Sequence, residues 1–217
     1  NMAVRSVVRE KANNLCDTIR STHQQITALQ KDLNAEIAVR VGRINSLAEQ
    51  IAGLNAEIAK ITSVGDQPND LMDQREVLVS ELSKMVSISI QSDELNRYSI
   101  SISGMLLVTG DTAYTMKTAL NADGMYDVVW SHNDQAVNFK NGEIKGLLEM
   151  RDLEIQSYID DLDEFATTLV DQFNSQHQGG YGFKGSNGLS FFKPGTGAAD
   201  ITLDNAILDP VEGLNNI

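Results

Sequence analysis

The chain has 217 residues and a formal net charge of −13 at pH 7, with 30 acidic residues against 17 Lys and Arg. The length allows one or two domains, and the negative charge argues against nucleic acid or an anionic membrane as the main partner. The charge is uneven, since residues 1–62 carry a formal charge of +2 and the remaining residues −15. No stretch approaches the ~20 consecutive apolar residues of a membrane span, and no signal peptide opens the chain.

The first predicted element is one long helix over Val4–Ile61, a stretch without proline. Its apolar residues recur mostly at alternating steps of four and three, the spacing that keeps one seam of a helix against a partner. A helix of this length would measure roughly 87 Å, so it must pack in a coiled coil or bundle. Four-residue steps separate the two series. They predict that the first half of the helix packs along a narrow seam against one other helix and that the second half packs over a broader face. The series are Val8, Ala12, Leu15, Ile19, Ile26, Leu29 and Leu33, then Ile44, Leu47, Ile51, Leu54, Ile58 and Ile61.

Cys16 is the only cysteine, so no intramolecular disulfide is possible. It falls beside the seam of the long helix. We interpret it as a small residue covered by a neighbouring helix rather than as a reactive thiol.

A second helix is predicted over Asn69–Val86. Gly65 is a stop signal for the first helix, and Asn69 is a good N-cap for the second. Asp70 and Asp73 would lie in its first turn, where carboxylates suit the helix dipole. Since the connection is only a few residues long, we expect this helix to fold back antiparallel onto the first.

Residues 87–140 predict a small antiparallel β region. The pattern changes to strict alternation of apolar and polar residues, which is typical of strands with one buried face. Gly104, Gly124 and Gly142 mark turns between or after these runs. We expect about five short strands, over 87–90, 98–102, 105–109, 126–130 and 136–139.

A further long helix is predicted from Asn141, as its N-cap, to His177. Arg151 is the one charged residue in its apolar series. Residues 179–217 are rich in turns, with a possible strand at Asp200–Leu203, and predict the truncated start of another module. The fold class is therefore α+β: a long antiparallel helical bundle or coiled coil (1–86 and 141–178), with 87–140 inserted as a β region. The apolar series is Ile144, Leu148, Arg151, Ile155, Tyr158, Leu162, Phe165, Leu169 and Phe173.

No motif in the sequence predicts catalysis, a cofactor or a metal. An acidic stripe on the last long helix predicts a solvated face rather than a metal site, because metal ligands must converge from several directions. The three histidines lie far apart in the sequence, and none belongs to a catalytic or zinc motif. We therefore expect no enzyme and no cofactor. The stripe contains Glu149, Asp152, Asp160 and Asp163, and the histidines are His23, His132 and His177.

Several blocks, in order, closely resemble the bacterial flagellar hook-associated protein 1 family, the FlgK type, which joins hook to filament. The blocks are Ile44–Ile58, Pro68–Ser83, Leu106–Gly110, Gly142–Asp152, Phe173–Tyr181 and Gly188–Phe192. The resemblance implies a structural component of the bacterial flagellum, extracellular and exported by the flagellar secretion apparatus without a cleaved signal peptide. It implies as partners the hook protein, the next hook–filament junction protein, copies of the same protein in a ring, and an export chaperone bound through segments missing here. The chain would then be a middle fragment of such a protein.

The resemblance also directs attention to a structural motif, Asn69, Asp70, Asp73, Gln74 and Arg75, together with Arg151. We hypothesise that Arg75 pairs with a carboxylate to fix the helix hairpin and that Arg151 acts similarly. The alternative is that both side chains reach out to solvent.

Two other functions stay open. The first is a generic coiled-coil dimerisation or scaffold protein in which Val4–Leu33 pairs with a second copy. The second, much less favoured, is a metal-dependent hydrolase that uses the acidic stripe.

Overall fold

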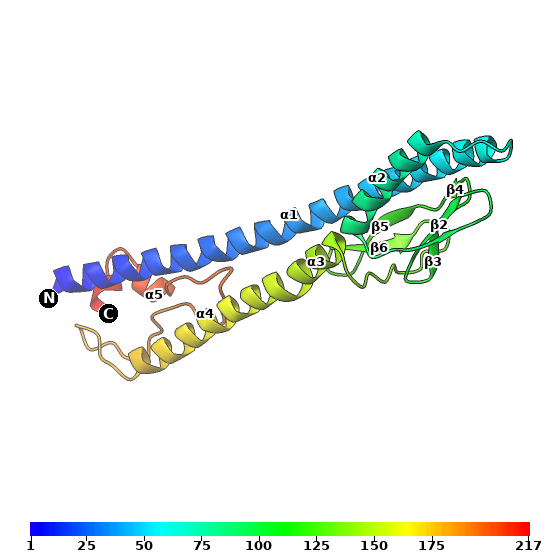
Figure 1. Cartoon of the computed structure of the whole chain (residues 1–217). Helices are drawn as coiled ribbons and strands as arrows, with labels where there is room; N and C mark the ends of the chain where they lie inside the picture. Colours follow the sequence, from blue (N-terminus) through cyan, green and yellow to red (C-terminus); the bar gives the residue numbers. More distant parts are fainter. The chain divides into compact units, whose positions relative to one another are not determined.

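The computed structural model describes residues 1–217, which divide into two compact units. Unit 1 comprises Asn1–Gln30 and Leu153–Ile217, and unit 2 comprises Lys31–Asp152. Helix α1 contributes its first half to unit 1 and its second half to unit 2 (Figure 1). These boundaries differ from the predicted ones, which separated the helices from the β region and residues 179–217 from both. None of the helices is long and apolar enough to cross a membrane.

Helix α1 runs from Met2 to Thr62, close to the predicted bounds. The second half is buried over a wide face, as predicted. This face includes pairs of adjacent residues, such as Leu47 and Ala48. The buried apolar residues of this half are Ile37, Val41, Ile44, Leu47, Ala48, Ile51, Ala52 and Ile58. In the first half only Cys16 and Ile19 are buried apolar residues, whereas Leu15 and Leu29 of the predicted seam are exposed. The first half therefore lacks a continuous packed seam.

Helix α2 spans Asn69–Met85 and runs back along the second half of α1 (Figure 1). Its buried residues Val79, Leu82 and Met85 enter the same core as the α1 face. The predicted N-cap was wrong: Pro68 holds the cap position, with no side-chain cap bond, and Asn69 is the first helical residue. The Pro68 carbonyl accepts hydrogen bonds from amides of the first turn instead.

The β region is antiparallel, as predicted, but it forms two sheets. Strands β1 (Ser89–Ser92), β2 (Tyr98–Ile102), β3 (Met105–Thr109) and β4 (Thr112–Ala113) pair in the order β1-β2-β3-β4. Strands β5 (Met116–Leu120) and β6 (Tyr126–Trp130) form a separate hairpin. The predicted strand at 136–139 is absent, and Ala136 makes only an isolated bridge to Val129.

The last long helix begins later than predicted and is interrupted. Helix α3 spans Glu143–Glu149, with Gly142 rather than Asn141 in the cap position. A π-helical segment, η1, follows over Met150–Glu154, and helix α4 continues over Ile155–Gln178. A π-helical turn holds one residue more than an α-helical turn and is often found at functional sites. Here it contains the buried Arg151.

Unit 1 is completed by the turn-rich segment 179–217, which contains helix α5 (Asn205–Leu208) and the short 3₁₀ turn η2 (Gly213–Asn215). The predicted strand at Asp200–Leu203 is reduced to one bridge between Phe192 and Leu203. This segment packs against α1 and α4 and helps to bury Cys16, for which a neighbouring helix was the expected cover. The core residues are Cys16, Ile19, Ala166, Val170, Phe191, Phe192, Ala198, Ile201, Leu203 and Ile207.

The buried face of α4 differs from the predicted series. Ala166, Val170 and Asn174 are buried, whereas the predicted Phe165 and Phe173 are 54% and 41% exposed. The partner of α4 in this core is the irregular segment around Phe191 and Phe192, not a helix with a matching seam.

We expect the substitution Gly142→Ala to destabilise unit 2 by about 2 kcal/mol or more. Gly142 has φ +102°, and a Cβ there would lie 2.6 Å from the Met85 carbonyl oxygen. Urea unfolding, followed by the fluorescence of Trp130, the only tryptophan, measures this change. Gly53→Ala is the matched control: it lies in the middle of α1 with open space around it, and it should stabilise the chain by about 0.5–1 kcal/mol. Equal effects of the two substitutions would contradict this reading.

Candidate functional site: asparagine clamps and buried arginines

Three asparagines of α1 hold the starts of three strands in unit 2. We call each an asparagine clamp, because its side-chain amide hydrogen-bonds to the backbone of an extended segment. Asn34 accepts from the Tyr126 amide at 2.7 Å. Asn45 accepts from the Met116 amide at 2.9 Å and donates to the Met116 carbonyl at 2.8 Å. The third clamp is Asn55.

The clamp at Asn55 is fully paired and fully buried. Its Oδ1 accepts from the Tyr98 amide at 2.9 Å, and its Nδ2 donates to the Tyr98 carbonyl at 2.8 Å. Nδ2 also donates to the Gly110 carbonyl at 2.7 Å, which ties the turn between β3 and β4 to α1. The amide thus behaves like a peptide group added to the edge of a strand, and its donors and acceptor satisfy backbone groups that would otherwise be costly to bury.

Arg75 of α2 completes the Asn55 site. Its side chain is fully buried, and its Nη1 donates to Asn55 Oδ1 at 2.9 Å and to the Asn96 carbonyl. The guanidinium carbon lies 3.5 Å from the centroid of the Tyr98 ring, a cation–π contact. The hypothesis of a carboxylate partner is wrong for this residue, because its acceptors are an amide and a carbonyl. The alternative of a solvent-exposed side chain is wrong as well.

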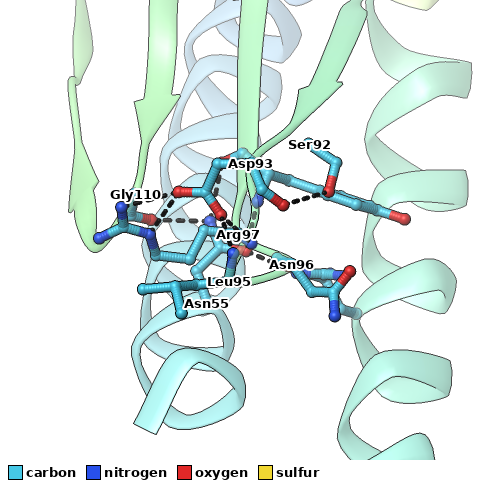
Figure 2. Close-up of polar contacts among 9 residues, drawn as sticks. Asn55, Ser92, Asp93, Leu95, Asn96, Arg97 and Gly110 are labelled. Carbon is cyan, nitrogen blue, oxygen red and sulfur yellow. Dashed lines mark hydrogen bonds and ion pairs between the residues drawn. The ribbon is translucent and has the colours of Figure 1, made fainter. Parts of the chain in front are cut away.

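The loop that carries Asn96 is held by its own polar contacts. Figure 2 shows Asn55 and Gly110 together with the loop residues Asp93, Leu95, Asn96 and Arg97. Asp93 Oδ1 accepts from the amides of Leu95 at 3.0 Å and Arg97 at 2.9 Å. Burial acts to raise the pKa of Asp93, but the hydrogen bonds from Arg97 and Leu95 outweigh it and lower that pKa. Asn96 adopts φ +58°, and this turn brings its carbonyl to Arg75.

Arg151 forms a second buried site with the Asn34 clamp. Its Nη1 donates to Asn34 Oδ1 at 2.7 Å and to the Tyr126 carbonyl at 2.8 Å. Its Nε and Nη2 bind the two carboxylate oxygens of Asp152, at 2.6 and 3.0 Å. Arg151 is 1% exposed. The carboxylate beside Arg151 is thus that of its neighbour in sequence, and its contacts with other elements are with Asn34 and the Tyr126 carbonyl.

A fourth clamp lies in unit 1. Asn174 of α4 accepts from the amides of Phe191 and Phe192, both at 2.8 Å, and donates to the Phe192 carbonyl at 2.8 Å. Phe191 and Phe192 are in turn buried against Phe173 and each other in edge-on or tilted contacts. The same device therefore fastens the irregular segment of unit 1 to its helix.

The other predicted motif residues do not enter these sites. The side chains of Asn69, Asp70, Asp73 and Gln74 are exposed on α2. Sequence reasoning missed the clamp asparagines and Tyr98. A signal was present, because Asn34, Asn45 and Asn55 recur at intervals of 11 and 10 residues, about three helical turns, although asparagine is a poor residue for a helix interior.

No three His, Cys, Asp or Glu side chains come together in a way that could hold a metal ion. Of the acidic stripe, Asp152 binds Arg151 and Asp163 accepts from the Ala198 amide at 2.8 Å. The polar groups of the two arginine sites join helices to strands.

Asn55→Ala should destabilise unit 2 by about 3–5 kcal/mol, because it leaves three partly buried backbone groups and one Arg75 donor without their Asn55 partner. Urea unfolding monitored at Trp130 gives the free energy of unfolding. The control is Gln50→Ala, an exposed position on the same helix, where a change within about 0.5 kcal/mol is expected. A loss below about 1 kcal/mol for Asn55→Ala would show that the clamp contributes little.

Stability should fall at high pH through Tyr98. A hydrogen bond to Glu76 is the main cause that raises the pKa of Tyr98, and burial adds to it. A raised folded-state pKa gives a contribution that is complete below the unfolded pKa of about 10 and is lost as the pH rises through the folded value. The free energy of unfolding of the wild type minus that of Tyr98→Phe should therefore decrease from pH 9 to pH 12. A constant difference over this range would refute the coupling.

The chain is similar in sequence to flagellar hook-associated proteins. The family model of the flagellar hook-associated protein FlgK helical domain matches residues 1–192. The chain is 31% identical to flagellar hook-associated protein 1 of Salmonella typhimurium, covering 94% of this chain and 39% of that protein. It is 29% identical to the protein of the same name from Bacillus subtilis, covering 95% of this chain and 48% of that protein.

A solved structure agrees in fold. The flagellar hook junction protein FlgK from Burkholderia pseudomallei superposes with a TM-score of 0.81 at 26% identity, covering 89% of this chain and 37% of that one. The chain thus spans less than half the length of these relatives. Because the family model covers most of the sequence, the chain belongs to the flagellar hook-associated protein FlgK family, through that family's helical domain.

Proposed function

We propose that this chain is a stiff structural part of a hook–filament junction protein of the bacterial flagellum. The relatives carry the names flagellar hook-associated protein 1 and flagellar hook junction protein. The observation that carries the proposal is the 61-residue helix α1, locked to two sheets by clamps at Asn34, Asn45 and Asn55. The proposed role is mechanical and involves no catalysis.

The clamps suit a protein that must transmit torque. Apolar packing is not directional, so a helix held only by apolar contacts resists sliding less than one that is also held by hydrogen bonds at fixed positions. The Asn55 site joins α1, α2, β2 and the turn after β3. The Arg151 site joins α1, β6 and η1. Unit 2 is therefore cross-linked at both sites by polar groups with defined geometry.

We propose the hook protein, the next junction protein, copies of the same protein and an export chaperone as partners, and an extracellular position after export by the flagellar apparatus. Exposed apolar residues in unit 1 support contacts with neighbouring subunits, because large apolar side chains that gather on a protein surface often mark interaction sites. They include Val8, Leu15, Leu29, Tyr158, Phe165 and Phe173. The absence of any possible disulfide suits a chain that is exported unfolded.

Self-association through a coiled coil is the second candidate function. It is favoured by one observation: Val8, Leu15 and Leu29 of the predicted seam remain exposed on α1. Light scattering coupled to size exclusion separates the two. A dimer that persists on dilution and is abolished by Leu15→Asp would favour the scaffold function. A monomer or weak oligomer supports the junction protein.

Complementation tests the junction function directly. The gene that encodes this chain should restore filament growth and swimming to a strain that lacks its own hook–filament junction protein. Asn55→Ala should reduce this rescue strongly at elevated temperature, because its fold is weakened, whereas Gln50→Ala should rescue fully. Failure of the wild-type gene, with the protein exported in normal amounts, would count against the proposal.

A further inference from the structure

The outer face of α2 carries a row of side chains at the spacing of a coiled-coil seam, which we call the outer seam. It lies on the side of the helix opposite the buried residues Val79 and Leu82. Its members recur at alternating steps of four and three residues, the spacing that keeps one row of a helix against a partner helix. Val77, at the centre, is 67% exposed, so the middle of the row is uncovered within the chain. The outer seam consists of Asp70, Gln74, Val77, Glu81 and Lys84.

A hollow of about 500 Å³ lies beside the centre of the outer seam, between α1 and α2. Its α1 wall comes from residues at positions i, i+3, i+4 and i+7, the four positions that form a hole for a knob in a coiled coil. Gly53 is one of them, and nothing lies within 4 Å of the place where a Cβ would stand. The hollow can therefore receive an apolar side chain from another helix. It is lined by Gln50, Gly53, Leu54 and Glu57 of α1 and by Gln74, Val77 and Leu78 of α2.

The outer seam is complementary to a second copy of itself that runs antiparallel. Asp70 and Lys84 stand seven residues to either side of Val77, so a two-fold axis at Val77 places each carboxylate opposite the other copy's ammonium group. Neither Asp70 nor Lys84 forms an ion pair within the chain. The same axis places Val77 of each copy over the hollow of the other. Opposite charges at the ends and an apolar centre thus favour a second copy as the partner.

The remaining positions of the outer seam fit this pairing. Gln74 faces Glu81 of the other copy, and that carboxylate can accept a hydrogen bond from an amide while it also binds Arg43. Asp73, beside the seam, faces the same Glu81–Arg43 ion pair, whose charges cancel. The polar positions are therefore compatible with the antiparallel register.

We propose that the outer seam of α2 and the hollow at Gly53 form a docking surface for a second copy of this chain, bound antiparallel. The contact covers only about four turns of one helix, so the dimer is weak and dissociates on dilution. The proposal rests neither on the junction function nor on the coiled-coil candidate, which uses the first half of α1.

Sedimentation equilibrium over a range of protein concentrations measures the association of the 217-residue chain. We expect the average mass of the wild type to rise with concentration toward twice that of the monomer. Val77→Asp should keep the chain monomeric, because it places a carboxylate in the apolar centre of the contact. Val64→Asp is the matched control: this exposed valine lies in the turn between α1 and α2, outside the seam, and its substitution should leave the association constant unchanged. Circular dichroism checks that each variant is folded.

Exchange of the end charges tests the antiparallel register. Asp70→Lys and Lys84→Glu should each weaken the dimer several-fold, because each sets like charges opposite each other at both ends of the contact. The double variant should restore the wild-type association, and this rescue does not require Val77→Asp to fold. Three results would overturn the proposal: a wild type that stays monomeric at every concentration, a dimer that Val77→Asp leaves intact, or a double variant that associates no better than the single ones.

Discussion

A strand that begins on the apolar face of a long helix brings unpaired backbone groups into a region without water. These groups must be paired, because a buried amide or carbonyl without a partner costs about 1–3 kcal/mol. In unit 2 the pairing comes from α1 itself, through the carboxamides of Asn34, Asn45 and Asn55. A carboxamide has the same donor and acceptor as a peptide group, so each asparagine acts as a short piece of strand edge carried by a helix. The arrangement of the two sheets on α1 depends on this pairing.

The arginines add to this arrangement but could not replace it. Both Arg75 and Arg151 bond to an oxygen that the clamp already uses for a strand amide. Such buried ionic groups are weak sources of net stability, and replacement by apolar residues is often neutral or stabilising. Their contribution here is geometric, because each arginine connects a further element to the clamp: α2 at Asn55, and η1 at Asn34. The π-helical segment η1 is the element that carries Arg151 to its acceptors.

Much of the secondary structure could be predicted from local pattern. The seam spacing predicted α1 within two residues at each end, alternation predicted β2, and the turns at Gly104 and Gly124 predicted β3 and β6 after them. Strand β5 was missed because Met116–Leu120 neither alternates nor follows a glycine turn directly, and it is held by pairing with β6. Both predicted N-caps were wrong by one residue. Pro68, not Asn69, is the N-cap of α2, and Gly142, not Asn141, is the N-cap of α3. The partners of Arg75 could not be predicted, since Asn55 lies 20 residues away and the Asn96 carbonyl depends on a turn with positive φ.

The spacing of the clamps turns separate hydrogen bonds into one constraint. Asn34 and Asn55 are 21 residues apart, roughly 31 Å along α1, and Asn45 lies between them. A slide of α1 by one turn would displace all three from their strand starts together, so the barrier is the sum of the clamps rather than the largest of them. At about 1 kcal/mol for each paired group, a concerted slip that breaks these hydrogen bonds costs several kcal/mol. A helix held in this way can bend only as far as the sheets fastened to it bend, which makes this part of the chain stiff.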